Sequence, residues 1–131
     1  MVAQVVDITL QDDGRYSVDD VVCAVDCGIA VNPDIVRAQM EGGIGFGLGA
    51  TMREAIEIDA GMVTAKNFDR YQTLRVSEMP RVAVHIVPSI NPPTGVGEPG
   101  VPPIGPALAN ALRAATGTAI HRLPIGRLIS A

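Results

Sequence analysis

The sequence predicts an α+β fold, in which a mixed sheet with a β-hairpin packs against a long glycine-rich helix and a C-terminal helix. Apolar residues alternate in two neighbouring segments near the start and again over residues 81–87, which is typical of strands. Helical signals begin at residues 32–33 and again near residue 104. Since 47% of the 131 residues are hydrophobic and 18% are charged, we expect one packed core and a single domain over residues 1–131.

The first predicted element is a β-hairpin over residues 2–26. A strand-like run over residues 2–10 is followed by a turn at residues 11–14 and by a second, valine-rich strand. Cys23 and Cys27 are four residues apart, a spacing that disfavours a disulfide within a strand. We therefore expect two small, buried thiols.

The second element is a helix that we expect to run from Pro33 to about Ile58. Asn32 can cap it, and proline suits the first helical position. Glycine in a helix costs about 1 kcal/mol relative to alanine, yet five occur within eight residues: Gly42, Gly43, Gly45, Gly47 and Gly49. Gly43, Gly47 and Ala50 form a smooth strip, against which another helix, a strand or a flat ligand can lie.

The rest of the chain is predicted as a turn at residues 59–61, a weakly patterned stretch to residue 78, a strand at 81–87 and a loop at 88–103. A last helix follows over residues 104–116. Ile104, Leu108 and Leu112 lie on its apolar face, and Gly117 marks its end.

The distribution of charge separates the chain into two parts. Residues 1–78 carry 13 carboxylates and 6 bases, whereas residues 79–131 carry four arginines and one carboxylate, Glu98. A single lysine and an aromatic content of 3% argue against nucleic-acid binding. No apolar run approaches the ~20 residues of a membrane span, and neither His85 nor His121 has partners at metal-ligand spacing.

The strongest local feature is Glu98, which lies between Gly97 and Pro99 in an otherwise uncharged loop. Glycines let the backbone approach a ligand closely, and prolines stiffen the loop around the carboxylate. A carboxylate held in this way can act as a general acid or base. The alternative is a solvated glutamate favoured by the dipole of the following helix.

Two further features invite a cofactor interpretation. Gln39 precedes the glycine strip by one helical turn and can hydrogen-bond a planar heterocycle, although a solvated glutamine is the alternative. Residues 45–50 match the G-x-G-x-x-[GA] dinucleotide pattern. That motif should follow a strand and open a helix, whereas here a helical segment precedes it, so the pattern argues weakly for a nucleotide-binding module.

Several segments together resemble the C-terminal part of the large subunit of molybdenum hydroxylases, the xanthine dehydrogenase and aldehyde oxidase family. The chain looks most similar to the isoquinoline 1-oxidoreductase beta-subunit branch. The resemblance spans residues 25 to about 126. It rests on VDCG at 25–28, VNP at 31–33, QMEGG at 39–43, FGLG at 46–49, NFD at 67–69, MP at 79–80, GVGEP at 95–99 and PALANA at 106–111.

The resemblance implies a part of a molybdopterin-binding domain, with a role for each matching residue. Glu98 would be the catalytic base of an enzyme that oxidises N-heterocycles or aldehydes with oxygen derived from water. Gln39 would hydrogen-bond the pterin, and Gly95, Val96 and Gly97 would bring backbone close to the metal's ligands. The strip at Gly43 would pack against the cofactor region. The family uses no protein ligand to molybdenum in this segment.

The resemblance also implies partners, because the family's large subunit is several times longer than this chain. We expect a C-terminal fragment that works with the remainder of the large subunit and with an iron–sulfur small subunit, since two cysteines cannot hold such clusters. Alone, the chain should lack the molybdenum cofactor and activity, and its bare apolar surfaces should favour self-association. The alternative is a non-catalytic remnant or assembly subunit without cofactor.

Overall fold

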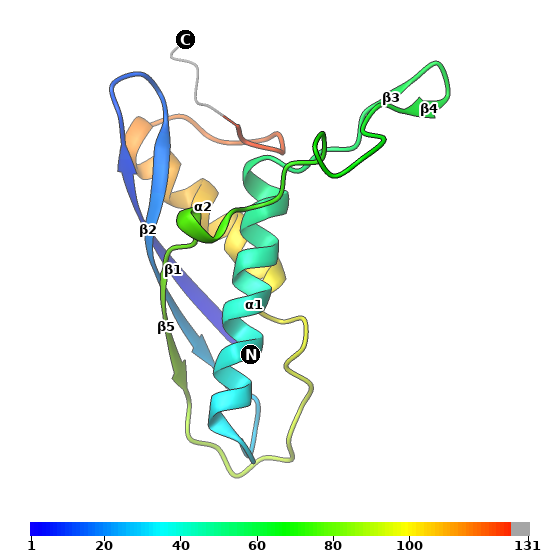
Figure 1. Cartoon of the computed structure of the whole chain (residues 1–131). Coiled ribbons are helices and arrows are strands. Elements are labelled where there is room, and N and C mark those ends of the chain that lie inside the picture. Colours follow the sequence, from blue (N-terminus) through cyan, green and yellow to red (C-terminus); the bar gives the residue numbers. More distant parts are fainter. Residues whose placement is uncertain (127–131) are drawn as a thin grey trace.

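The computed structural model describes residues 1–126. Two layers form its body (Figure 1): a three-stranded sheet, and two helices that pack on one face of that sheet. Helix α2 lies mainly over strand β1, and helix α1 lies over strand β5. A slender arm, residues 54–75, extends from the end of α1 beyond both layers. The predicted α+β class and mixed sheet are therefore confirmed.

The sheet has the order β1-β2-β5. β1 (Val2–Leu10) and β2 (Tyr16–Val25) form the predicted antiparallel hairpin, and β5 (Arg81–Ile86) pairs with β2 in parallel. A bulge at Asp7/Ile8 leaves Asp19 without a partner in the register. That extra residue keeps Val18 and Val21, three positions apart, on the same buried face of the sheet.

Helix α1 (Pro33–Met52) begins where the sequence predicts. The Asn32 side chain accepts hydrogen bonds from the backbone N–H groups of Asp34 and Ile35, at 3.1 Å and 3.2 Å. The expected end near Ile58 is wrong, because the helix stops at Met52. The N–H groups of Arg53 and Glu54 both donate to the Gly49 carbonyl, which closes the last turn.

Helix α2 (Val101–Thr116) starts three residues earlier than predicted. Pro102 and Pro103 belong to its first turn, where proline is tolerated because no N–H is needed there. Gly117 ends the helix in the left-handed conformation, with φ 75°, and its N–H donates to the Arg113 carbonyl. The predicted stop at Gly117 is confirmed.

The glycine strip of α1 packs against helix α2, which decides among the three partners left open by the sequence. A Cβ added at Gly43 would lie 3.3 Å from the Gly100 Cα, and one added at Gly47 would lie 2.5 Å from Ile104 Cγ2. Thr51 continues the strip, 3.1 Å from the position of a Cβ at Gly105. Ala50 is exposed and lies outside this contact.

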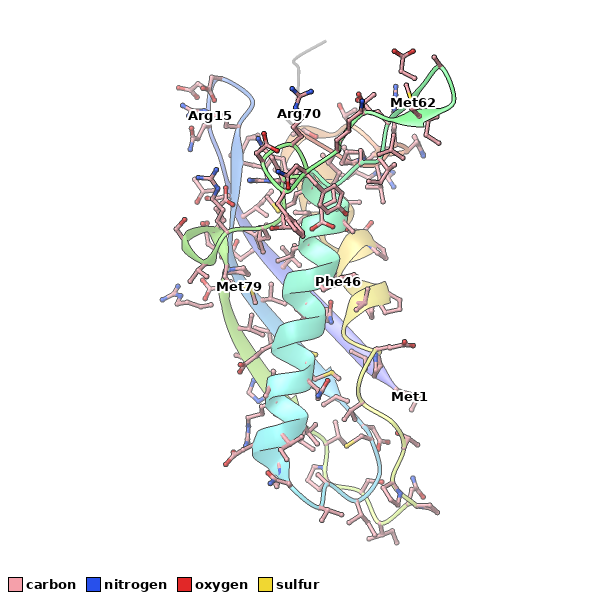
Figure 2. All side chains as sticks on the ribbon, turned by 45° about the vertical axis from the view of Figure 1, so that its right-hand side comes forward. Met1, Arg15, Phe46, Met62, Arg70 and Met79 are labelled. Carbon is pink, nitrogen blue, oxygen red and sulfur yellow. The ribbon has the colours of Figure 1, made fainter. Side chains whose placement is uncertain are left out.

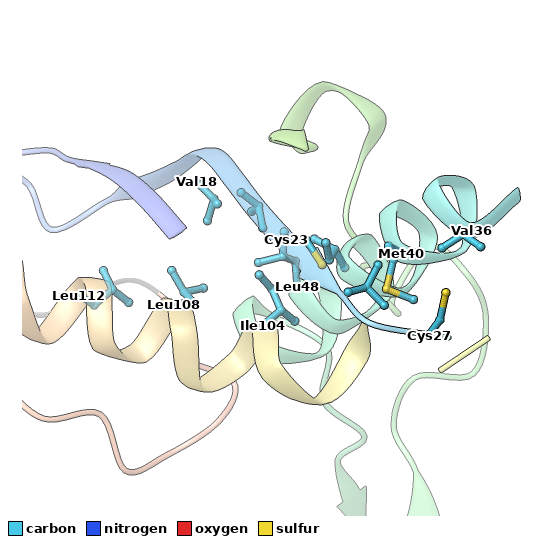
Figure 3. Packing of buried hydrophobic residues seen from close by; sticks show 12 residues of the cluster. Val18, Cys23, Cys27, Val36, Met40, Leu48, Ile104, Leu108 and Leu112 are labelled. Carbon is cyan, nitrogen blue, oxygen red and sulfur yellow. The ribbon is translucent and has the colours of Figure 1, made fainter. Parts of the chain in front are cut away.

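The core fills the space between the helices and the sheet (Figure 3). It is built from aliphatic side chains, methionine and both cysteines, which are free and buried as expected. The most completely buried side chains are Met40, Ile44, Leu48, Ile104, Leu108, Leu112, Val21, Val25 and Cys23. Because they come from α1, α2 and β2, the core locks the two helices to the central strand.

The arm carries a small hairpin, β3 (Ile58–Asp59) and β4 (Met62–Val63), and leads to a 3-10 turn, η1 (Val76–Glu78). Figure 2 shows Met62 at the far end of the arm, away from Met1 and Phe46. At its base, Arg53 forms a two-pronged ion pair with Glu78, at 2.7 Å and 3.1 Å, and Tyr71 donates to Glu54 at 2.9 Å. No helix in the described part of the chain is long and apolar enough to cross a membrane.

Candidate functional site

The candidate site is the loop between β5 and α2, residues 87–100, which we call the Glu98 loop. Its first half docks on the turn that joins β2 to α1. The Ile29 N–H donates to the Asn91 carbonyl at 3.0 Å, and the Thr94 N–H donates to the Cys27 carbonyl at 2.8 Å. The turn includes Cys27 and Gly28 of the VDCG segment, and Thr94 directly precedes the GVGEP segment.

Gly28 makes this docking possible. It adopts a φ of +74°, which L-residues with a side chain rarely adopt. A Cβ there would collide with the carbonyl oxygens of Pro92 and Asn91, the latter 2.7 Å away. The backbone of the Glu98 loop therefore occupies the space that any other residue at position 28 would fill.

The far end of the loop is held at Gly100. The Gln4 side-chain Nε2 donates to the Gly100 carbonyl at 3.0 Å, from the sheet side. On the helix side, the Met40 carbonyl lies 3.0 Å from the position of a Cβ at Gly100. Residues 95–99 thus form a short bridge between two fixed points, Thr94 and Gly100.

The carboxylate of Glu98 is exposed and has no hydrogen-bond partner among residues 1–126. It does not cap helix α2, whose N-terminus has no side-chain cap. The Val101 N–H already donates to the Glu98 carbonyl at 2.9 Å, and Pro102 and Pro103 have no N–H to offer. The helix start therefore leaves this carboxylate free for another task.

The backbone of the bridge is also free to bind. Within the described chain, the amide nitrogens of residues 95–98 donate no hydrogen bond, and the Cβ directions of Gly95 and Gly97 point into open space. Beneath the bridge lies a cavity of about 330 Å³ whose lining includes Val25, Cys27 and Val96. Unpaired N–H groups next to an apolar hollow suit a planar or oxygen-rich ligand.

The other predicted residues lie on the adjoining turn of α1. Gln39 is exposed, and its amide has no partner among the described residues. It precedes Met40, whose carbonyl contacts Gly100. Gly43 is buried against Gly100, so inside this chain it serves close packing. Direct contact of Gly43 with a cofactor stays a prediction.

These observations test whether the residues suit a molybdopterin group. Such a group carries hydrogen-bond donors and acceptors along its length, so it needs unpaired polar partners. The Gln39 amide, the amides of residues 95–98 and the Glu98 carboxylate supply them on neighbouring segments. The residues present therefore fit the group.

The comparison with protein families now defines the class. Residues 1–80 match the family described as molybdopterin cofactor-binding domain, and this chain belongs to that family. The resemblance noted in the sequence is thereby confirmed.

Two relatives of known name match most of the chain. The chain is 40% identical over 115 residues to the isoquinoline 1-oxidoreductase subunit beta of Brevundimonas diminuta, a match covering 88% of this chain and 15% of the relative. It is 38% identical over 101 residues to a protein of Gluconacetobacter polyoxogenes named membrane-bound aldehyde dehydrogenase [pyrroloquinoline-quinone], covering 77% of this chain and 13% of that protein. The chain thus spans about a seventh of these relatives.

A solved structure has the same fold. Quinoline 2-oxidoreductase from Pseudomonas putida 86 superposes with a TM-score of 0.80 at 24% identity, over 88% of this chain and 16% of that one. This likeness supports the α+β arrangement described above.

The sequence reasoning missed Gln4, which reaches the Glu98 loop from strand β1. A signal was present, because Gln4 falls on every second position with Val2, Val6 and Ile8 and so faces inward with them. A polar side chain at such a position needs a partner inside the fold. The neighbouring Cys23 Sγ lies 3.9 Å from Gln4 Nε2, and burial raises the pKa of the Cys23 thiol, which favours the neutral form.

Proposed function

We propose that this chain is the C-terminal segment of the molybdenum-binding subunit of a hydroxylase, and that Glu98 is its general base. The substrates would be N-heterocycles or aldehydes, and the oxygen added to them would come from water. The observation that carries this proposal is the Glu98 carboxylate, which is unpaired, exposed and held on a five-residue bridge between two anchored points.

The residues of the chain divide the work as follows. The carboxylate of Glu98 accepts the proton released as the substrate is oxygenated, because a positioned carboxylate without a competing partner is suited to proton transfer. The Gln39 amide hydrogen-bonds the pterin. The backbone N–H groups of Gly95, Val96 and Gly97 hold polar atoms of the cofactor. When bound, the cofactor supplies the redox chemistry.

The remaining parts of the site would come from outside this chain, which matches about 15% of its isoquinoline-oxidising relative. The remainder of the large subunit would supply the other cofactor contacts and most of the substrate pocket. An iron–sulfur small subunit would receive the electrons. The isolated 131-residue chain should show no turnover.

Molybdenum content of the native gene product, purified through a tag on this segment, is the first test. Near-stoichiometric molybdenum is the expected result. One relative is named for a different cofactor, pyrroloquinoline quinone. Direct measurement of molybdenum therefore decides which cofactor this protein binds. Absence of molybdenum, from cells that load other molybdoenzymes, would favour the cofactor-free remnant or assembly subunit.

The substitution Glu98→Gln tests the role of the base in the molybdenum-loaded protein. It keeps the shape of the side chain and removes its basicity, so turnover should fall about 10²–10⁴-fold while molybdenum content stays the same. Glu57→Gln is the matched control, because Glu57 is an exposed glutamate on the arm. Equal turnover by Glu98→Gln and Glu57→Gln would refute the assignment.

A further inference from the structure

Gln4 differs from its neighbours on strand β1. The side chains of Val2, Val6 and Ile8 point into the same layer and pack against the hydrophobic core. Gln4 Nε2 donates to the Gly100 carbonyl at 3.0 Å. Gln4 Oε1 is buried and has no hydrogen-bond partner in the described part of the chain.

The unpaired oxygen argues that Gln4 is not present for stability alone. Burying an amide oxygen without a partner costs free energy, whereas methionine has a similar length and carries no such atom. What methionine cannot supply is the N–H donor to the Gly100 carbonyl. The donor is therefore the distinctive contribution of glutamine at this position.

Gly100 is the residue through which this donor acts. It follows Glu98 by two residues, and its carbonyl begins the hydrogen-bond ladder of helix α2. A carbonyl has two lone pairs, so the second can accept from Gln4. On the other side, Met40 and Gly43 of α1 press against the Gly100 backbone. Gly100 is thus held between the sheet and α1. Of these contacts, the hydrogen bond from Gln4 is the one that fixes the direction of the Gly100 carbonyl.

We propose that Gln4 is a positioning residue that sets the placement of Glu98 by holding the Gly100 carbonyl. This role rests on the proposed function of Glu98 as the base. Gln4 acts through the backbone of residues 98–101 and touches neither substrate nor cofactor. Loss of its donor should loosen the downstream anchor of the bridge while the anchor at Thr94 and Cys27 persists.

Hydrogen exchange by NMR on the 131-residue chain tests this placement without any cofactor. The reporter is the Val101 N–H, which donates to the Glu98 carbonyl at 2.9 Å. Its protection should fall about five- to tenfold in Gln4→Met, the effect of losing one net hydrogen bond. The Val87 N–H, bonded to the Val25 carbonyl at 2.8 Å, reports on the sheet and should keep its protection. Gln72→Met, at an exposed glutamine, is the control variant.

Gln4→Glu distinguishes a role as hydrogen-bond donor from a role in filling space. Circular dichroism verifies that Gln4→Met and Gln4→Glu fold. The glutamate has the same shape, but it can donate to the Gly100 carbonyl only when protonated. Its Val101 protection factor, relative to that of Val87, should therefore be near the wild-type value at low pH and reduced once the carboxyl ionises. A pH-independent ratio in Gln4→Glu, or unchanged Val101 protection in Gln4→Met, would overturn the role of Gln4.

The molybdenum-loaded gene product provides the functional arm. Gln4→Met should lower kcat about fivefold and leave KM and molybdenum content unchanged, because the base is displaced and binding is not. If Gln4→Met keeps the wild-type kcat while Glu98→Gln loses most of its turnover, the positioning role of Gln4 is refuted and the proposed role of Glu98 stands. Full turnover in Glu98→Gln would remove the proposed function and the role of Gln4 with it.

Discussion

Replacement of Gly47 by alanine should destabilise the chain, although alanine is the better helix former. Gly47 lies at the centre of the contact between α1 and α2. An added Cβ would lie 2.5 Å from Ile104 Cγ2 and 2.9 Å from the Val101 carbonyl oxygen. Neither atom can easily move away, since Cγ2 is fixed to a β-branched carbon and the oxygen belongs to the backbone of α2.

The size of the effect follows from these distances. Carbon atoms pack best at about 3.5–4.0 Å, so α2 must shift by about 1 Å relative to α1. Overpacking of this kind costs about 3 kcal/mol, and the better helix propensity of alanine returns about 1 kcal/mol. The free energy of unfolding should therefore fall by about 2 kcal/mol, equivalent to about 8 °C in Tm.

Gly42→Ala is the matched control, because a Cβ added at Gly42 meets nothing within 4 Å on the exposed side of the same helix. It should raise the free energy of unfolding by about 1 kcal/mol. Urea and thermal unfolding followed by circular dichroism measure both variants. The reasoning is refuted if Gly47→Ala is as stable as the wild type or gains stability together with Gly42→Ala.

Two further predictions concern Tyr16 and Asn32. Burial raises the pKa of Tyr16 to about 12, so the folded state disfavours the phenolate and should lose stability as pH rises from about 10 to 12, with none lost below that window. Tyr16→Phe should reduce this loss, measured by urea unfolding at pH 9 and pH 11, and leave the part due to Tyr71 and Cys23, whose pKa values are also raised. The substitution should cost little at pH 7, because the buried Tyr16 hydroxyl has no partner in the described chain. An identical pH dependence in Tyr16→Phe would contradict this. Asn32→Ala should lower the free energy of unfolding by about 1 kcal/mol through loss of the α1 cap, whereas Asn32→Asp should keep the cap. Equal urea midpoints for Asn32→Ala and Asn32→Asp would argue against a stabilising cap at Asn32.

Local patterns in the sequence predicted the local elements well. The hairpin followed from alternation around a turn, and the start of α1 followed from Asn32 and Pro33. The end of α1 was missed because distant side chains help to define it. Arg53, directly after the helix, pairs with Glu78, which is 25 residues away. No local pattern contains such a contact.

The candidate site was predictable only in part, because local motifs reveal candidate residues but not the distant contacts that bring them together. Glu98 and Gln39 were named as candidates from motifs, yet how their segments meet depends on tertiary packing. The glycine strip was recognised, but its partner was left open among a helix, a strand and a ligand. The structural role of Gly28, which was named only as part of the VDCG segment, and the role of Gln4 were not foreseen, because both roles depend on residues far along the chain, at Pro92 and Gly100.

The two anchors of the Glu98 loop also have a consequence for the order of folding. The hairpin and α1 close over short stretches of chain, whereas the bonds from Thr94 to Cys27 and from Gln4 to Gly100 join residues 67 and 96 positions apart. Closing such long loops costs more conformational entropy, and these contacts form only after the segments between them have packed. During synthesis, strand β1 is made before Gly100, so the Gln4 side chain gains its hydrogen-bond partner only after the segments between them have been made. The bridge that carries Glu98 is therefore among the last parts of the chain to become ordered. It reaches its final geometry only when the rest of the fold has formed.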